Sequence, residues 1–140
     1  MNYTIHPLFL GRFRDFEKSI FTYRTDAGEK IEPPLFAYLV IGGDEIILVD
    51  TGPFAPALAK NKTHREVHEA RTLSSTLEEQ GLTPGDISRI VLTHLHWDHA
   101  YNLELFPTTP ILIQKKELQY AVTPLPSDIV AYGYDPRNGP

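Results

Sequence analysis

The feature that most constrains the fold is a short apolar strand that leads directly into a cluster of histidines. Residues 88–93 (Ser-Arg-Ile-Val-Leu-Thr) predict a buried strand, and the next six residues read His-Leu-His-Trp-Asp-His. Side chains at positions i and i+2 of an extended segment point to the same side. His94 and His96 can therefore bind one cation together.

The chain after this strand is predicted to turn into a helix. Asp98 suits the N-cap position of a helix that begins near His99 and runs through Leu105, and Pro107 would stop it. Asp98 and His99 would then face a second cation. Imidazole and carboxylate ligands favour zinc, iron, cobalt or manganese, and the absence of cysteine removes thiolate ligands. A histidine-rich turn without ligands is the plain alternative, but three of the six histidines fall in this one cluster.

At these residues the chain resembles the metallo-β-lactamase superfamily, whose signature is H-x-H-x-D-H at the end of a strand. Within that superfamily it is similar to the N-acyl-homoserine-lactone lactonases. The similarity spans nearly all of the chain, and its supporting stretches are Phe21-Thr22-Tyr23, Gly28-Glu29-Lys30-Ile31, Ile46 to Gly52, Thr93 to Asn102 and Leu105-Phe106-Pro107. The resemblance implies an α/β fold: the N-terminal half of a four-layer αββα sandwich, with a mixed sheet and helices on one face.

The resemblance also implies a reaction. His94, His96, Asp98 and His99 would bind two zinc ions, for which iron, cobalt or manganese could substitute, and Asp98 would be the catalytic side chain. A metal-bound hydroxide oriented by Asp98 would attack the carbonyl of an ester or lactone, with a small N-acyl-homoserine-lactone-like substrate. Hydrolysis of a thioester, β-lactam or phosphodiester, or di-iron oxidoreduction, would use the same cluster, so the motif leaves these open.

The same comparison predicts that the site is incomplete. Family members continue for about as many residues again, and that half supplies a third histidine for the first metal, a bridging aspartate and a histidine for the second metal. No histidine follows His99 here, and the later carboxylates are Glu104, Glu117, Asp128 and Asp135. A catalytic zinc usually has three protein ligands. We therefore expect one domain over residues 1–140 that lacks the C-terminal half; the alternatives are a non-catalytic remnant or one piece of a two-chain assembly.

The pattern of apolar and turn residues predicts mainly short strands first and helices later. We expect a strand from Tyr3 to Leu10, a loop over 11–34, a hairpin of strands 35–41 and 45–49, irregular chain over 53–69, a helix from Arg71 to Gln80 ended by Gly81, a strand over 111–113, a helix from about Lys115 to Ala121 and a loop or tail over 123–140. Several strands are apolar at consecutive positions, which indicates burial on both faces. Helices can cover one face, and the other needs a complementary C-terminal half or a second copy of the chain.

Composition excludes several classes of partner. The net charge is −5 without a basic block, which argues against nucleic acid and anionic membranes. No segment approaches the roughly 18 apolar residues of a membrane span, and the N-terminus lacks the pattern of a signal peptide. We therefore expect a cytoplasmic protein, which the lack of cysteine fits.

Other polar residues have two interpretations each. Asp50 ends an apolar strand and could cap a turn, but the resemblance and its place at a strand end imply a carboxylate that fixes the tautomer of a ligand imidazole. His64 and His68 have the spacing of a zincin helix, yet Arg65 stands where that motif needs glutamate, so a solvated or loop role is expected. Trp97 could equally pack in the core or line a pocket.

Overall fold

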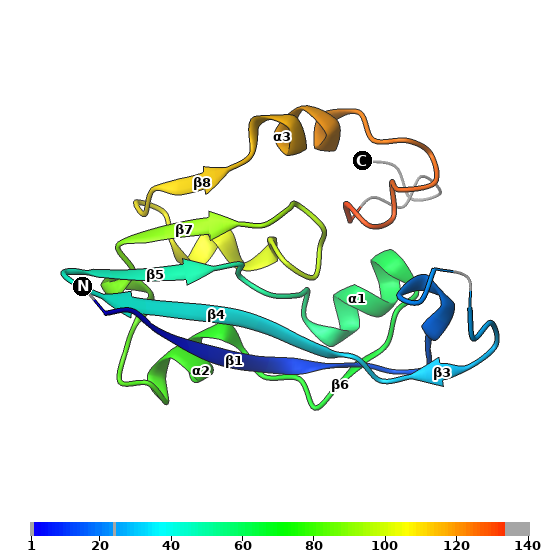
Figure 1. Ribbon diagram of the computed structural model, residues 1–140, viewed down its shortest axis with the longest axis horizontal. Helices are drawn as coiled ribbons and strands as arrows, with labels where there is room; N and C mark the ends of the chain where they lie inside the picture. The colour runs from blue at the N-terminus through cyan, green and yellow to red at the C-terminus, as the bar shows by residue number, and fades with distance from the viewer. Residues whose placement is uncertain (1, 24, 134–140) are drawn as a thin grey trace.

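The computed structural model describes residues 2–23 and 25–133, and a mixed six-stranded sheet dominates it (Figure 1). The strand order is β6-β1-β4-β5-β7-β8. These strands are β1 (Thr4–Phe13), β4 (Pro34–Gly42), β5 (Glu45–Val49), β6 (Val67–His68), β7 (Arg89–Leu92) and β8 (Ile111–Ile113). The tail predicted over residues 123–140 lies partly, from 134 onward, outside the described residues.

Pairing in the sheet changes from antiparallel to parallel at β5. β1 pairs antiparallel with β4, and β4 with β5, which confirms the predicted hairpin. β5, β7 and β8 then run parallel, because the chain returns through a helix or loop between them. The first strand extends past its predicted end: Gly11, at a φ of 139°, takes up a register shift inside β1, so the strand continues to Phe13.

The two faces of the sheet are buried to different degrees. On one face Leu8, Leu39, Leu48 and Ile90 are at most 2% exposed. On the other, the cross-strand row formed by Tyr38, Val49, Val91 and Leu112 is apolar but open, with Tyr38 39% and Leu112 48% exposed. The predicted burial of the strands on both faces is therefore seen for one face only within the described residues, and the other face is apolar but open.

Two helices contact the strands at the β6-β1 edge of the sheet, one of them β1 and the other β6. α2 (Leu73–Glu78) is shorter than predicted; it starts at Thr72, whose hydroxyl accepts the Ser75 N–H, and buries Leu73 and Leu77 as expected. α1 (Pro56–Thr63) contradicts the prediction of irregular chain. Its buried residues are Ala59 and Thr63, which are small or polar, so the sequence carries no apolar period there.

The predicted helix after the histidines is wrong in type and start. Residues 97–99 form a turn, and a 3₁₀ helix, η3 (Tyr101–Leu105), follows with Ala100 and not Asp98 at its N-cap. The backbone N–H groups of Thr51 and Gly52 both donate to the His99 carbonyl, so that carbonyl is held by a neighbouring loop. An α-helix beginning at His99 would need this carbonyl for its own first turn. Later in the chain, β8 and α3 (Lys115–Val122) lie where the sequence predicts them.

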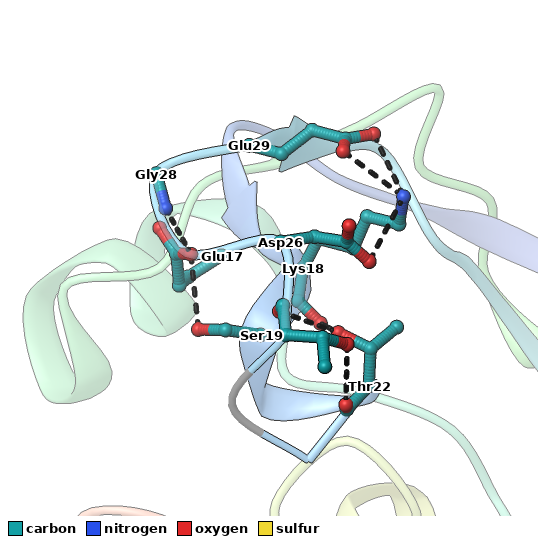
Figure 2. A network of polar contacts seen from close by, with 8 residues as sticks. Glu17, Lys18, Ser19, Thr22, Asp26, Gly28 and Glu29 are labelled. Atoms are coloured by element: carbon teal, nitrogen blue, oxygen red, sulfur yellow. Dashed lines mark hydrogen bonds and ion pairs between the residues drawn. The ribbon is translucent and has the colours of Figure 1, made fainter.

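The predicted loop over residues 11–34 contains a small two-stranded ribbon. β2 (Phe16–Glu17) pairs with β3 (Lys30–Ile31), and the 3₁₀ helix η1 (Lys18–Ile20) lies between them. Figure 2 shows how charged side chains tie this segment together. Lys18 contacts Asp26 and Glu29, and Glu17 accepts the Gly28 N–H. The segment is therefore ordered by polar contacts although much of it is exposed.

None of the helices in the described parts of the chain is long and apolar enough to cross a membrane. The longest of them, α1 and α3, have eight residues each. A helix needs about 20 predominantly apolar residues to span a bilayer. This agrees with the sequence, in which no such apolar stretch occurs.

Candidate metal centre

The candidate metal centre forms where parallel strands β5 and β7 end side by side. Asp50 follows β5 and Thr93 follows β7, so both lie at the same edge of the sheet. The two loops are then joined by backbone hydrogen bonds: Thr51 N–H and Gly52 N–H donate to His99 O at 2.6 and 3.2 Å. The Asn102 amide adds a bond to Thr51 O at 2.7 Å. This pairing brings the histidine loop next to Asp50.

Asp50 is a buried carboxylate with three donors around it. It is 4% exposed and has a positive φ of 61°. His99 Nδ1–H donates to its Oδ2 at 2.8 Å, and the Thr93 N–H donates to its Oδ1 at 2.8 Å. In the neutral ring, Nδ1 of His99 carries the donated hydrogen, so Nε2 has the free lone pair. The role predicted for Asp50, fixing the tautomer of an imidazole, agrees with this geometry.

Thr93 has a role that sequence reasoning missed. Its hydroxyl donates to Asp50 Oδ2 at 2.8 Å and lies 3.0 Å from His94 Nδ1. A hydroxyl that donates its one hydrogen to the carboxylate can only accept from the imidazole, so His94 Nδ1 carries a hydrogen and its Nε2 is free. The signal available in the sequence was its place at the end of β7, where a hydroxyl reaches the neighbouring strand end.

The imidazoles of the cluster lie close to one another. The ring centroids of His94 and His96 are 4.4 Å apart, and those of His94 and His99 are 4.1 Å apart. The Asp98 Oδ2 lies 3.6 Å from His99 Nε2. Within residues 2–23 and 25–133, however, no three histidine, aspartate or glutamate side chains are arranged to hold one ion. The donors are those that a borderline divalent cation prefers, so they fit such an ion, but as a partial ligand set.

Burial and charge shift the pKa values of these groups in opposite directions. Burial and the two neighbouring imidazoles lower the pKa of His94. Burial would lower the pKa of His99 as well, but the hydrogen bond to Asp50 and the charge of Asp98 outweigh it and raise that pKa. Burial would raise the pKa of Asp50, yet the bonds from His99 and Thr93 keep it below its usual value. At neutral pH Asp50 is therefore a charged acceptor.

A cleft of about 510 Å³ opens beside the histidines. His94, His96, Asp98 and His99 line its polar side. The apolar side includes Phe16, Ile20, Phe21, Trp97 and Val130. The cleft thus combines imidazole and carboxylate donors with apolar side chains, and Arg65 also lines it. Such a mixed lining suits a ligand with one polar and one apolar end.

The structure also places the other residues that the sequence analysis considered, Trp97, His64 and His68. Trp97 combines both roles foreseen for it: it is 6% exposed, its ring stacks on Phe54 at 5.2 Å, and it also lines the cleft. His64 ends α1 in the left-handed conformation and His68 lies in β6, so they do not share one helix face. The zincin interpretation of these two histidines is therefore excluded, as the sequence already argued.

Comparison with known proteins identifies relatives that match most of the chain. The metallo-beta-lactamase superfamily model matches residues 34–136. An N-acyl homoserine lactonase from Bacillus cereus is 31% identical over 104 residues, which cover 67% of this chain and 42% of that protein. The chain therefore spans less than half the length of this curated relative.

Solved structures give the same result for the backbone. A crystal structure of the Bacillus thuringiensis protein AiiA with N-decanoyl-L-homoserine bound at the active site has a TM-score of 0.74 and 25% identity, covering 94% of this chain and 58% of that one. An N-acyl homoserine lactone hydrolase with N-hexanoyl-L-homoserine at its catalytic metal centre has a TM-score of 0.73 at 23% identity, with the same two coverages. The predicted fold class is confirmed by these similarities.

Proposed function

Because the chain belongs to the metallo-beta-lactamase superfamily, we propose that it supplies part of the active site of a metal-dependent hydrolase acting on a lactone or ester. The observation that carries this proposal is the cleft that is lined both by the four candidate metal-ligand side chains and by apolar side chains. The relatives in the comparison are N-acyl homoserine lactonases, whose substrates combine a polar lactone head with an acyl chain. A substrate of that kind suits both sides of the cleft.

In this proposal His94 and His96 bind one divalent cation, and Asp98 and His99 bind a second. The free Nε2 of His99, next to the Asp98 carboxylate, supports the second pairing. Zinc is the expected ion, with iron, cobalt or manganese as substitutes. When bound, such ions activate a water for attack on a carbonyl and stabilise the negative charge that develops.

The side chains of the chain itself perform the supporting steps. Asp50 and Thr93 hold the His99 and His94 rings in the tautomers that leave Nε2 free. Asp98, whose side chain is 19% exposed, is able to accept a proton at its carboxylate and pass it to a leaving group in the cleft. The apolar side chains that line the cleft, Ile20 and Phe21 among them, provide a surface on which the acyl chain binds.

A complete site in this proposal needs further ligands. Two protein ligands are fewer than the three of a typical catalytic zinc, and the matched relative is more than twice as long as the part that aligns. The open apolar row that includes Tyr38 and Leu112 would be covered by a complementary C-terminal half. A non-catalytic remnant is the competing interpretation, and it predicts the same fold without turnover.

Substrate profiling tests this function. The protein as it is naturally produced, with any complementary C-terminal half, is incubated with zinc and with lactones of several acyl lengths, a thioester, a β-lactam and a phosphodiester. The initial rate on each substrate is measured. We expect lactones to be hydrolysed fastest and His94→Ala with His96→Ala to abolish turnover, whereas Asp44→Ala in the exposed hairpin turn should not change it. Faster hydrolysis of another substrate class would exclude the lactonase assignment, and no turnover with any substrate would favour the remnant.

Association of residues 1–140 by themselves is a separate test. Each large aliphatic side chain that becomes buried contributes roughly 1.5–3 kcal/mol, so the open row should drive assembly. Without a complementary half, we expect light scattering to show a complex of the chain with a second copy of itself, and metal analysis to find partial occupancy. When a complementary half is supplied, it should take the place of the second copy. A monodisperse monomer that binds no hydrophobic dye and retains two metal ions through dialysis would contradict the proposed half-site.

A further inference from the structure

One carboxylate next to the candidate metal centre is not among the proposed ligands but contacts the loop that carries them. Glu117 is the third residue of α3, and Gln114 at the N-cap of that helix makes no side-chain cap hydrogen bond. A glutamate at this position commonly reaches back to the N-terminus of its own helix. Here Glu117 Oε1 instead accepts the backbone N–H of Leu95 at 2.9 Å. Glu117 therefore joins α3 to the loop between His94 and His96.

The sheet explains why these two segments meet. β7 and β8 are parallel neighbours with Leu92 opposite Ile113. The histidine loop follows β7 and α3 follows β8, so both begin at the same edge of the sheet. A side chain from the first turn of α3 can then reach the backbone of the neighbouring loop, where Leu95 has no strand partner.

The same oxygen of Glu117 also accepts a hydrogen bond from the segment that follows α3. The Tyr132 hydroxyl donates to Glu117 Oε1 at 2.9 Å. The Tyr132 ring meets the His96 ring at 90°, with centroids 4.8 Å apart. One position further along, the Trp97 N–H donates to Ala131 O at 2.9 Å. The segment around Tyr132 and the loop around His96 are thus linked through one carboxylate oxygen.

The ionisation of the pair suits this arrangement. Burial would raise the pKa of Glu117, but the bonds from Leu95 and Tyr132 outweigh it and lower the pKa. Burial, together with the bond to Glu117, raises the pKa of Tyr132 to about 12. Around neutral pH Glu117 is therefore a charged acceptor and Tyr132 a protonated donor, so both hydrogen bonds persist.

We propose that Glu117 is a positioning residue that fixes the backbone between His94 and His96 and, through Tyr132, the orientation of the His96 ring. The inference rests on the proposed role of these two histidines as metal ligands. Glu117 does not itself bind the metal; it acts through the Leu95 N–H and the Tyr132 hydroxyl. Groups that orient metal ligands in this way typically contribute 10–100-fold to metal affinity.

Four variants of the protein as it is naturally produced separate this role from a merely structural one. Glu117→Leu removes both hydrogen bonds, and Glu117→Asp keeps the charge but is one methylene too short to keep both. Glu117→Gln retains an acceptor oxygen at the same reach. Lys116→Ala, exposed on the same helix, is the matched control.

The first readout is titration with Co²⁺, followed by the visible absorption of the bound ion. We expect Glu117→Leu and Glu117→Asp to bind Co²⁺ about 10–100-fold more weakly with an altered spectrum. Glu117→Gln, which retains an acceptor oxygen, should bind Co²⁺ with an affinity within about threefold of that of the unchanged protein. Lys116→Ala should bind Co²⁺ as tightly as the unchanged protein does. Unchanged affinity and spectrum in Glu117→Asp and Glu117→Leu would overturn the proposal, as would a Glu117→Gln variant no better than Glu117→Leu.

The second readout is amide hydrogen exchange of Leu95 without metal. We expect exchange to become about five- to tenfold faster in Glu117→Leu and Glu117→Asp, which corresponds to the loss of roughly one hydrogen bond. An unprotected Leu95 amide in the unchanged protein would overturn the inference. If the unchanged protein binds no Co²⁺, the proposed metal function fails, while this exchange result still decides whether Glu117 fixes the loop. If Glu117→Leu does not fold, Glu117→Asp supplies both readouts.

Discussion

The hydrogen bonds around Asp50 and those around Glu17 use the same chemistry in different surroundings. Asp50 is 4% exposed and accepts from His99 and Thr93 at the end of the sheet. Glu17 has a 26% exposed side chain; it accepts hydrogen bonds from Gly28 and Ser19, which Figure 2 shows, and also from Lys30. Water can replace a lost partner in the exposed network but not in the buried one. The buried network should therefore stabilise the fold, and the exposed one should mainly order a local segment.

Of these substitutions, Asp50→Ala should lower the free energy of unfolding the most. The substitution leaves the His99 and Thr93 donors without a buried acceptor and puts alanine at a positive φ. We expect the free energy of unfolding to fall by about 3 kcal/mol, measured by urea denaturation. Asp50→Asn tolerates the backbone conformation and should cost less, because it keeps one acceptor oxygen. A loss no greater than that of Asp44→Ala would show that burial of the network contributes little.

Asp98→Ala should separate chemistry from stability at the same site. Asp98 contacts the His99 ring edge but supports no other element in the described parts of the chain. We expect turnover of a lactone by the completed protein to fall by about 100-fold or more, because the substitution removes the proposed metal ligand and proton carrier. The urea midpoint should change little. Near-normal initial rates in this variant would exclude Asp98 from the reaction.

Thr93→Val should lower the free energy of unfolding by less than Asp50→Ala and by more than Glu17→Gln. It keeps the shape of the side chain and the backbone N–H but removes the hydroxyl between Asp50 and His94. We expect a loss of about 1 kcal/mol in the free energy of unfolding. The imidazole NMR signals of His94 should also show a changed tautomer population. The exposed Thr108→Val is the control, and equal behaviour of the two variants would remove Thr93 from the network.

Glu17→Gln should lower the free energy of unfolding the least of these substitutions. The contribution of Glu17 to stability should, however, show the clearest dependence on pH. Hydrogen bonds from Lys30, Gly28 and Ser19 lower the pKa of Glu17 from 4.5 to about 2. Because the pKa is lower in the folded protein, its contribution to stability is present above pH 4.5 and is lost as the pH falls toward 2. NMR titration of the Glu17 carboxyl should give a midpoint near 2. A midpoint near 4.5 would mean that the network of Figure 2 does not hold in solution.

The residues that sequence analysis assigned correctly share a local signal. The hairpin of β4 and β5 follows from two apolar runs around Gly42-Gly43-Asp44, and α2 from Leu73 and Leu77 four residues apart. The errors also have local causes. α1 buries only Ala59 and Thr63, which leave no apolar period, and the α-helix expected at His99 is replaced because its carbonyl bonds to Thr51 and Gly52.

Spacing along the chain was enough to nominate His94, His96, Asp98 and His99 as ligands, since neighbouring residues of a strand and turn must lie close together. Whether they hold a metal stays a prediction. The partners of these residues depend on contacts that no short segment encodes: Asp50 is 49 residues from His99, and Glu117 is 22 residues from Leu95. Parallel pairing of β5, β7 and β8 brings those distant positions to one edge of the sheet. Local patterns thus supplied the donors and pointed to Asp50 as an orienting carboxylate. Only tertiary packing decided that Asp50 bonds to His99 and that Thr93 and Glu117 take part, because these contacts depend on which strand ends become neighbours.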